Sequence, residues 1–273
     1  MKSDKINQLY FHDVKTPPVQ IDRREFLKNI GGGIIIIFSF SQLSFISGNK
    51  ALNENEFPEF NAYLRVKEDG RVECFSGKVE MGQGINRSLA QVLADELEIS
   101  PDMVDMIMGD TELCPYDAGT WGSMTTRFHD PLIRAAAAEA REVLKKLASE
   151  KLGVPVEQLK TENGVIFIAS DRDKKITYSE LSKGKKIIQS VSEKPVLKKP
   201  GEFKFTGKSH LRSDSVEKVT GKALYAADIR LPGLLNAKIV RPPAHGSKLV
   251  SVDTSAAETI SGVQIKREDD FIF

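Results

Sequence analysis

Apolar and polar residues alternate along residues 61–68 and again along residues 71–75, with Asp69-Gly70 between the two segments. Alternation with a period of two is typical of a strand that buries one face, and Asp-Gly favours the type I′ turn that joins two such strands. The pattern therefore predicts a β-hairpin. Asn163-Gly164 stands between two further short segments and predicts a second hairpin within residues 156–182.

Two helices are expected after the first hairpin. An amphipathic helix over 85–98 is predicted by apolar residues at helical spacing, namely Ile85, Leu89, Val92, Leu93 and Leu97. Residues 104–108 form a short apolar segment that predicts a strand. A longer helix is expected from Asp130, its predicted cap, through Pro131 to about Leu152. The fold class is therefore α+β, a mixed or antiparallel sheet with helices on one face.

Each predicted helix follows a loop that is rich in glycine. Residues 77–84 read Gly-Lys-Val-Glu-Met-Gly-Gln-Gly, and residues 109–123 carry further glycines and the only tryptophan. Glycine lets backbone N–H groups approach a bulky or anionic ligand, and a helix N-terminus favours negative charge. Two interpretations remain open. The loops hold one ligand from two sides, or they are ordinary connections between strands and helices.

The N-terminal residues 1–48 have the layout of an export signal. Arg23-Arg24 is followed by Phe26-Leu27-Lys28 and then by an apolar run over residues 30–46, which is short for a membrane-spanning helix. Adjacent arginines before such a run are typical of the twin-arginine route. Asp22 stands where that pattern usually has Ser or Thr. The alternative interpretation is a buried helix.

Composition excludes some functions. The 273 residues carry a net charge of +1, which argues against a general nucleic-acid binder. Cys74 and Cys114 are the only cysteines, too few for a four-cysteine zinc or iron–sulfur site. Buried free thiols are favoured over a disulfide between them.

The C-terminal third has a different character. Residues 183–215 are rich in Lys, Ser and Pro and are expected to form a linker. Residues 216–273 begin a second domain, in which residues 235–240 predict a strand and residues 241–246 a turn. The chain stops at the apolar, strand-like residues 271–273, which is unusual for a complete domain because an unpaired edge would be exposed.

Three blocks of sequence resemble the molybdenum hydroxylase family, which includes xanthine dehydrogenase and aldehyde oxidase. The resemblance is closest to the large (beta) subunit of the isoquinoline 1-oxidoreductase type. It covers roughly residues 60–150 and 216–265. The blocks are residues 77–84 with the helix after them, residues 108–111 together with 119–126, and residues 218–229 together with 241–243. The last block resembles an a/b hammerhead domain. With the signal segment 1–48 and the linker 183–215 inferred above, the resemblance adds a molybdopterin-binding portion 60–182 and a truncated hammerhead domain 216–273.

The resemblance also implies the cofactor and its contacts. In this family the Glu-Met-Gly-Gln-Gly loop lies against the pyranopterin of a molybdenum cofactor, often in its cytosine dinucleotide form. The expected contacts are Met81, Gly82, Gln83, Gly84, Gly122, Ser123 and Met124. Because the cofactor itself holds molybdenum, no protein metal ligand is expected. His129 and His245 are therefore interpreted as packing or surface residues, and Glu80 as a structural acceptor.

Two family features are not found in this sequence, the Gly-Val-Gly-Glu-like motif of the catalytic glutamate and a second glycine-rich loop of the Gly-Gly-Gly-Phe-Gly type. We therefore assign no catalytic residue and expect a portion of a larger oxidoreductase that is inactive alone. The whole enzyme would hydroxylate an aldehyde or N-heterocycle carbon with oxygen from water. The expected partners are a [2Fe-2S] small subunit, a C-terminal half and an electron acceptor at the membrane, in or beside the periplasm.

Two alternatives stay open. The chain could be a non-catalytic assembly subunit that is completed by a separately encoded C-terminal half. It could also be a bare binding domain, which would require the two glycine-rich loops to lie far apart. The substrate does not follow from these residues.

Overall fold

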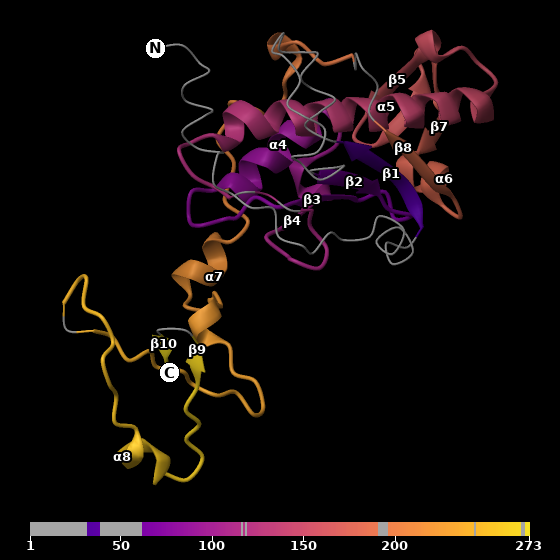
Figure 1. Ribbon diagram of the computed structural model, residues 1–273. Coiled ribbons are helices and arrows are strands. Elements are labelled where there is room, and N and C mark those ends of the chain that lie inside the picture. The colour runs from indigo at the N-terminus through magenta and orange to yellow at the C-terminus, as the bar shows by residue number, and fades with distance from the viewer. Residues whose placement is uncertain are drawn as a thin grey trace. The chain divides into compact units, whose positions relative to one another are not determined.

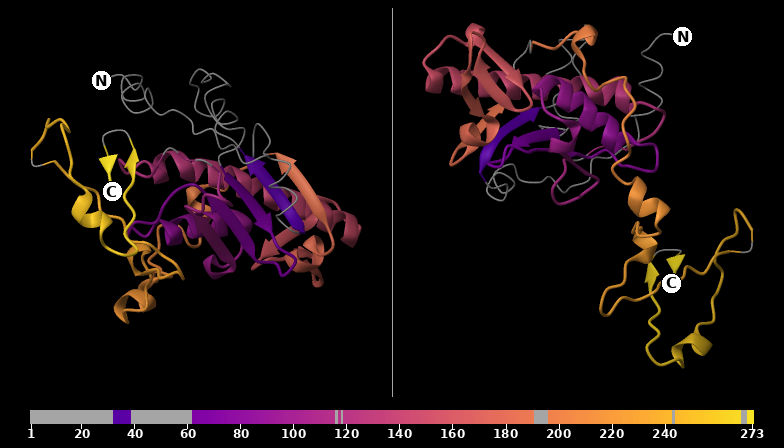
Figure 2. Two further views of the ribbon diagram at one scale, coloured as in Figure 1. Left: turned by 60° about the horizontal axis from the view of Figure 1, so that its bottom comes forward. Right: turned by 180° about the vertical axis from the view of Figure 1, so that it is seen from behind.

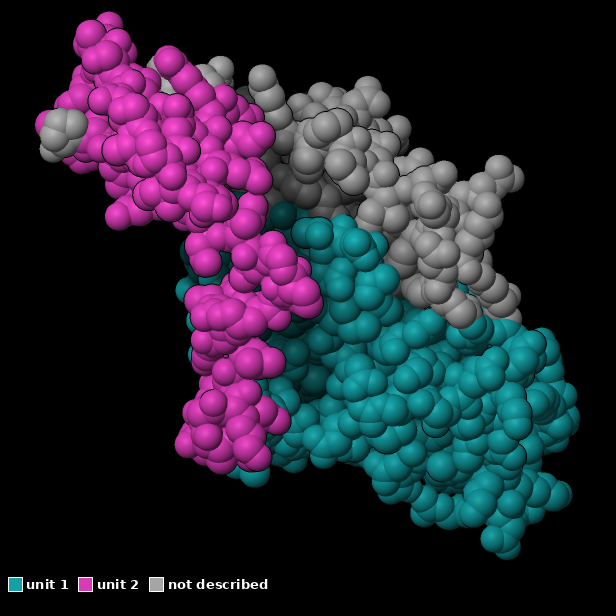
Figure 3. All heavy atoms as spheres, turned by 90° about the horizontal axis from the view of Figure 1, so that it is seen from below, with its two compact units in different colours: residues 1–215 teal, residues 216–273 magenta. Residues whose placement is uncertain are grey.

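The structure is a computed structural model that describes residues 32–38, 62–115, 117, 119–190, 196–242, 244–268 and 271–273. It divides into two compact units, one ending at Ser215 and the other formed by Val216–Phe273. Figure 3 colours the two units separately.

A mixed five-stranded sheet forms the centre of the first unit (Figure 1). Its strand order is β4-β3-β2-β1-β8, in which the outer pairs β3–β4 and β1–β8 are parallel and the inner pairs are antiparallel. The strands are β1 (Gly33–Phe38), β2 (Ala62–Val66), β3 (Val72–Ser76), β4 (Val104–Met108) and β8 (Lys186–Ser190). The predicted α+β class, with a mixed or antiparallel sheet, is confirmed.

The first hairpin is confirmed, but its predicted turn type is wrong. Strands β2 and β3 pair antiparallel, with Val66 opposite Val72. Gly70 has a φ of 84° and donates its N–H to the carbonyl of Lys67, whereas Asp69 does not adopt a positive φ. A type I′ turn needs two residues with positive φ, so this loop is a longer turn that ends in a left-handed glycine.

Strand β1 corrects the assignment of the whole segment 1–48 to a signal. It lies between β2 and β8, and Ile34, Ile35 and Ile36 have no exposed surface. These isoleucines combine high strand propensity with complete burial, which stabilises the centre of the sheet. This part of the apolar run therefore belongs to the folded unit, while Arg23-Arg24 lies outside the described residues.

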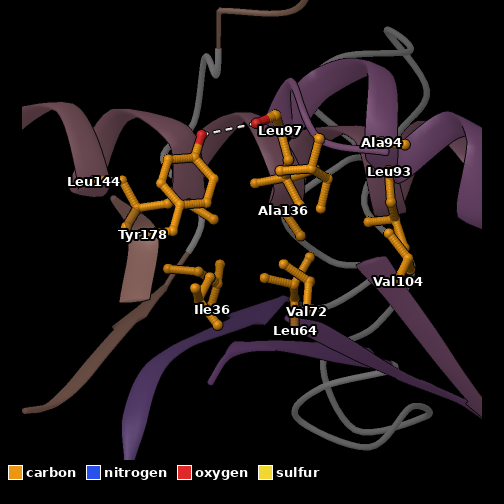
Figure 4. Close-up of a cluster of buried hydrophobic side chains, with 14 of the residues drawn as sticks. Ile36, Leu64, Val72, Leu93, Ala94, Leu97, Val104, Ala136, Leu144 and Tyr178 are labelled. Carbon is orange, nitrogen blue, oxygen red and sulfur yellow. Dashed lines mark hydrogen bonds between the residues drawn. The ribbon is translucent and has the colours of Figure 1, made fainter. Parts of the chain in front are cut away.

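Helices α4 (Ile85–Leu97) and α5 (Asp130–Leu152) cover one face of this sheet, as predicted (Figures 1 and 2). Their apolar faces meet the sheet in one core, in which Leu93 and Leu97 of α4 and Ala136 and Leu144 of α5 face Ile36 and Leu64 (Figure 4). The run of alanines in α5 lets the two helices approach closely, because small side chains allow backbones to come together.

A buried charge also joins the two helices. Glu96 of α4 has no exposed surface and accepts hydrogen bonds from Arg134 (2.7 and 2.9 Å) and Arg141 (3.0 Å) of α5. A carboxylate in such a place must be neutralised, since an unpaired buried charge costs several kcal/mol. These pairs fix how far α4 and α5 are displaced along one another.

A three-stranded antiparallel sheet follows α5, with strand order β5-β6-β7. Its strands are β5 (Leu159–Glu162), β6 (Val165–Ile168) and β7 (Asp171–Thr177), and α6 (Tyr178–Ser182) comes directly after them. Asn163 and Gly164 both have positive φ, 50° and 74°, so the predicted second hairpin is confirmed and has the geometry of a type I′ turn. Short turns connect other elements: η2 (Pro101–Met103), η4 (Val156–Gln158) and η5 (Pro200–Glu202).

The predicted linker 183–215 contains ordered structure. Residues 186–190 form β8, and residues 196–214, which we call the strap, run along α4. Asp95 of α4 is 2% exposed and accepts hydrogen bonds from the backbone N–H groups of Lys204, Phe205 and Thr206 at 2.6–3.0 Å. The strap is therefore a bound part of the first unit.

The second unit has little regular structure among its described residues. Its elements are α7 (Ser215–Val219), which begins at the boundary, η6 (Ala226–Asp228), α8 (Ser255–Glu258), β9 (Arg267–Glu268) and β10 (Phe271–Ile272). The predicted strand at 235–240 is wrong, although the N–H of Val240 donates to the carbonyl of Ile272. The strand-like ending is confirmed, because β10 pairs with β9. Many of its apolar side chains are exposed, including Leu224 at 81% and Val250 at 94%.

Replacing Tyr178 by Phe tests how α6 is attached to α4. The Tyr178 hydroxyl donates a buried hydrogen bond of 2.7 Å to the carbonyl of Leu97 (Figure 4), so the variant leaves a buried acceptor unpaired. We expect the free energy of unfolding in urea to fall by about 1–2 kcal/mol. The same change at Tyr225, which is 58% exposed, should leave it within about 0.5 kcal/mol of wild type. Equal effects of the two substitutions would contradict the buried hydrogen bond.

Candidate functional site

The two glycine-rich loops lie side by side. The N–H of Val79 in the first loop donates to the hydroxyl of Thr120 in the second at 2.9 Å. Lys78 Nζ donates to Asp117 Oδ1 (2.8 Å) and to the carbonyl of Gly119 (2.9 Å). A Cβ on Gly77 would lie 2.6 Å from the carbonyl oxygen of Pro115, so only glycine permits this approach. A bare binding domain with separated loops is therefore excluded.

A buried hydrogen bond lies beneath the two loops. Ser76, the last residue of β3, and His129, which precedes α5, are both buried, and Ser76 Oγ lies 2.8 Å from His129 Nε2. Burial, together with the positive charge of Lys78, lowers the pKa of His129 to about 4, although Asp117 acts in the opposite direction. His129 is therefore a neutral packing residue, as predicted from sequence. No sequence pattern pointed to its pairing with Ser76.

The first loop is closed by its own glutamate. Glu80 accepts hydrogen bonds from the N–H groups of Gly82 (2.8 Å), Gly84 (2.9 Å) and Asn86 (3.0 Å), at the beginning of α4. Burial alone would raise the pKa of Glu80, but these N–H groups and the charge of Arg212 lower it below its ordinary value. The interpretation of Glu80 as a structural acceptor is confirmed. The α4 N-terminus, which we expected to face an anionic ligand, holds this carboxylate instead.

The predicted contacts in the first loop differ in what they offer a ligand. Met81 is 66% exposed, and the space around Gly82 is open, because a Cβ added there would have no atom within 4 Å. Gln83 Oε1 accepts from the N–H of Met81 (2.6 Å), and Gln83 Nε2 donates to the carbonyl of Val79 (2.9 Å). The Gln83 side chain therefore holds the loop in shape, and its amide is engaged at both ends.

The second loop presents backbone donors. Gly122 and Ser123 both have positive φ, 61° and 54°, and Met124 returns to φ −89°. A π-helical turn, η3 (Thr125–His129), follows and leads directly into α5, with no side-chain cap at its start. A change in the sign of φ makes successive N–H groups converge, and an uncapped helical start leaves donors free for a ligand.

The start of α5 corrects a further prediction. Asp130 is the first residue of α5 and does not cap it, and its buried Oδ1 has no hydrogen-bond partner among the described residues. Burial raises the pKa of Asp130 to about 7, which Arg134 opposes. The helical turn before Asp130 explains the difference, because the helical conformation already begins at Thr125.

The described residues contain no group of three or more His, Cys, Asp and Glu side chains that could hold a metal ion. Cys74 and Cys114 are both buried and free, as favoured from sequence. No helix in the described ranges is long and apolar enough to cross a membrane. The candidate site is therefore described by the two paired loops, residues 77–84 and 119–124, which we call the wall.

Comparison with known protein families identifies the family of the chain. Residues 10–229 match the model of the molybdopterin cofactor-binding domain. The chain belongs to this family, that of molybdenum hydroxylase large subunits. Both glycine-rich loops and the whole strap lie within the matched residues.

Two relatives show how much of a large subunit the chain represents. The nicotinate dehydrogenase B subunit of Pseudomonas putida is 36% identical over 213 residues, which are 75% of this chain and 18% of that protein. The beta subunit of isoquinoline 1-oxidoreductase of Brevundimonas diminuta is 27% identical over 286 residues, 90% of this chain and 36% of that protein. The chain therefore spans between about a fifth and a third of these relatives.

Solved structures match over part of the chain. Quinoline 2-oxidoreductase from Pseudomonas putida aligns with 54% of this chain and 18% of its own, at 25% identity and a TM-score of 0.41. A Cu,Mo-CO dehydrogenase aligns with 44% of this chain and 15% of its own, at 28% identity and a TM-score of 0.40.

Replacing Glu80 by Gln tests the closure of the first loop. The amide keeps the shape but loses the charge that strengthens three N–H bonds, and we expect the amides of Gly82, Gly84 and Asn86 to exchange with solvent about tenfold faster. Hydrogen exchange read by mass spectrometry measures this. Because the pKa of Glu80 is lowered in the fold, wild type should lose the same protection as the pH falls through that lowered value. Unchanged exchange in the variant would contradict this assignment.

Because His129 is buried and neutral beside Ser76, we expect the stability of the folded protein to fall in acid. Below pH 6.5 the unfolded chain protonates His129, while the folded chain does so only near pH 4, so stability falls as the pH is lowered between these values. The melting temperature of wild type should fall more steeply over this range than that of His129→Gln, whose amide can still bond Ser76. His245→Gln, at an exposed position, should behave as wild type. Parallel pH curves for wild type and His129→Gln would show that His129 is not held neutral.

Proposed function

We propose that this chain forms one wall of the molybdopterin site in a molybdenum hydroxylase large subunit. The observation that carries this proposal is the pairing of the two glycine-rich loops, one open at Gly82 and the other with uncapped backbone donors. Together they fit a flat, polar, anionic group such as a pterin and its phosphate. The bound cofactor supplies the two-electron redox chemistry by which these enzymes oxidise carbon with oxygen from water.

The residues have separate roles in this proposal. The N–H groups of Gly122 and Ser123 hydrogen-bond the cofactor's oxygen atoms, whereas that of Met124 donates to the carbonyl of Trp121 (3.2 Å) and holds the second loop in shape. Met81 and Gly82 form the apolar and open side of the wall. Gly84 begins α4 in a left-handed conformation, with a φ of 83°. Gln83 contributes through the shape of the loop, because its side-chain amide is held by Met81 and Val79, which leaves one N–H and one lone pair for a ligand.

In this proposal, other polypeptides supply the catalytic base and the electron-transfer centres. No residue here is assigned as the catalytic base, so the chain is inactive alone and a further portion of the large subunit supplies that group. A [2Fe-2S] small subunit receives the electrons and passes them to an acceptor at the membrane. The cofactor is the cytosine dinucleotide form, and the segment before β1, which carries Arg23-Arg24, directs export by the twin-arginine route to the periplasm. An aldehyde or an N-heterocycle is the substrate.

A non-catalytic assembly subunit is the second candidate. The exposed apolar residues of the second unit favour it, since side chains such as Leu224 and Val250 are expected to be covered by another polypeptide. A separately encoded C-terminal half would then complete the cofactor site.

Cofactor retention by matched glycine variants tests the proposed wall. We would purify the full chain from a host that makes molybdopterin, with and without the C-terminal portion of a homologous large subunit, and quantify pterin and molybdenum. Gly122 and Gly153 have similar positive φ, 61° and 68°, so alanine introduces similar strain at each, about 1–2 kcal/mol. Only Gly122→Ala should lower pterin retention, because its methyl group would press on the side chain of Met124 within the second loop, whereas a Cβ on Gly153 would meet no atom within 4 Å.

Two outcomes would contradict the proposal. Equal pterin retention in the two variants would show that the second loop does not contact the cofactor. Stoichiometric cofactor together with turnover in the isolated chain would show that the site and its base are complete without a further portion.

A further inference from the structure

At one end, the strap is held to α4 by hydrogen bonds to the buried carboxylate of Asp95. The three consecutive N–H groups of residues 204–206 converge on the carboxylate of Asp95, which is nearly fully buried. Gln91, one turn earlier, donates from Nε2 to the carbonyls of Phe205 (2.6 Å) and Lys208 (3.0 Å). Charge-assisted bonds of this kind are strong, so the course of the strap along α4 is fixed.

The other end of the strap reaches the first glycine-rich loop through Arg212. This side chain donates from NH1 to the carbonyl of Gly82 at 2.9 Å, and its NH2 lies 3.5 Å from Glu80 Oε1. It also forms a two-pronged pair with Asp214, in which Nε and NH2 each donate at 2.8 Å. A guanidinium presents its donors in one rigid plane, so it can hold these acceptors at the same time.

These contacts fall on the part of the loop that faces the proposed ligand. Glu80 closes the loop by accepting three N–H groups, and Arg212 balances its charge while directing the carbonyl of Gly82 toward itself. A Cβ added at Gly82 would have no atom within 4 Å, so packing does little to hold this stretch. Its conformation therefore depends on hydrogen bonds, and Arg212 reaches Gly82 from outside the loop.

We propose that Arg212 is a positioning residue for the cofactor wall. It holds Gly82 and Glu80 so that residues 81–84 keep the conformation that receives the cofactor. This inference rests on the proposed function for its ligand, and on the contacts of Arg212 for its mechanism. It assigns to the strap a role that the sequence, read as a linker, does not suggest.

The test compares Arg212→Gln and Arg212→Lys with a surface control in the full chain. Arg172 is the control, because it also pairs with a glutamate, Glu162, and lies over the ring of Phe167 on the small sheet; its side chain is 68% exposed, against 34% for Arg212. We expect the amides of Gly82 and Gly84 to exchange about tenfold faster in Arg212→Gln, corresponding to a lost hydrogen bond to a charged group. Lysine keeps the charge but has a single donor group, so its effect should be intermediate.

Two further readouts separate positioning from general stability. The amides of residues 204–206 should exchange as in wild type, and the melting temperature should change no more than in Arg172→Gln. Pterin retention by the assembled large subunit should fall several-fold in Arg212→Gln only. Unchanged exchange at Gly82 and Gly84 would show that Arg212 does not hold the first loop. Faster exchange with full pterin retention would overturn the role toward the cofactor.

The proposed function can fail separately. If wild type with the complementary portion binds no pterin, the cofactor role of Arg212 falls with it. The exchange experiment would then still decide whether Arg212 holds the loop.

Discussion

The buried carboxylate of Glu96 is the constraint on which the arrangement of this unit depends. It has no exposed surface and is neutralised by Arg134 and Arg141, which project from the neighbouring helix α5. Both arginines come from α5, so sliding α4 along α5 would break both pairs and leave the Glu96 charge unpaired in the interior. The helices are therefore held in one relative position. Each helix carries a glycine-rich loop at its N-terminus. Fixing the helices therefore also brings the two loops together, where Thr120 and Lys78 join them.

The two loops differ in the backbone donors that they can offer a ligand. Glu80 already satisfies the donors at the start of α4, while η3 and α5 begin without a side-chain cap. An anionic group is therefore expected to bind toward the second loop, and the first loop provides shape and an open backbone surface. This division follows from one carboxylate, and it explains how two loops of similar composition can serve one ligand differently.

Much of the fold could be predicted from sequence because its signals are local. The alternation around β2 and β3, the spacing in α4 and the Asn163-Gly164 turn each act over a few residues. The turn type at Asp69-Gly70 and the cap at Asp130 were local errors, and the remaining errors come from contacts between distant segments. Nothing near residues 204–206 shows that Asp95 will bind them, and no local pattern places β1 between β2 and β8.

The candidate site shows the same limit. Glycine patterns located both loops, but the engagement of Gln83 within its own loop and the buried Ser76–His129 pair appeared only in three dimensions. Arg212 was missed because 130 residues separate it from Gly82 in the chain. Sequence could therefore place the wall but could not say which of its side chains are free to meet a ligand.

Hydrogen exchange of the large subunit, assembled with and without molybdopterin, tests the central claim most directly. We expect the amides of residues 121–127 to become strongly protected when the cofactor binds, and those of residues 81–84 to be protected in the same transition. Protection of only one loop, or of neither, would contradict the claim that the paired loops form one wall of the cofactor site.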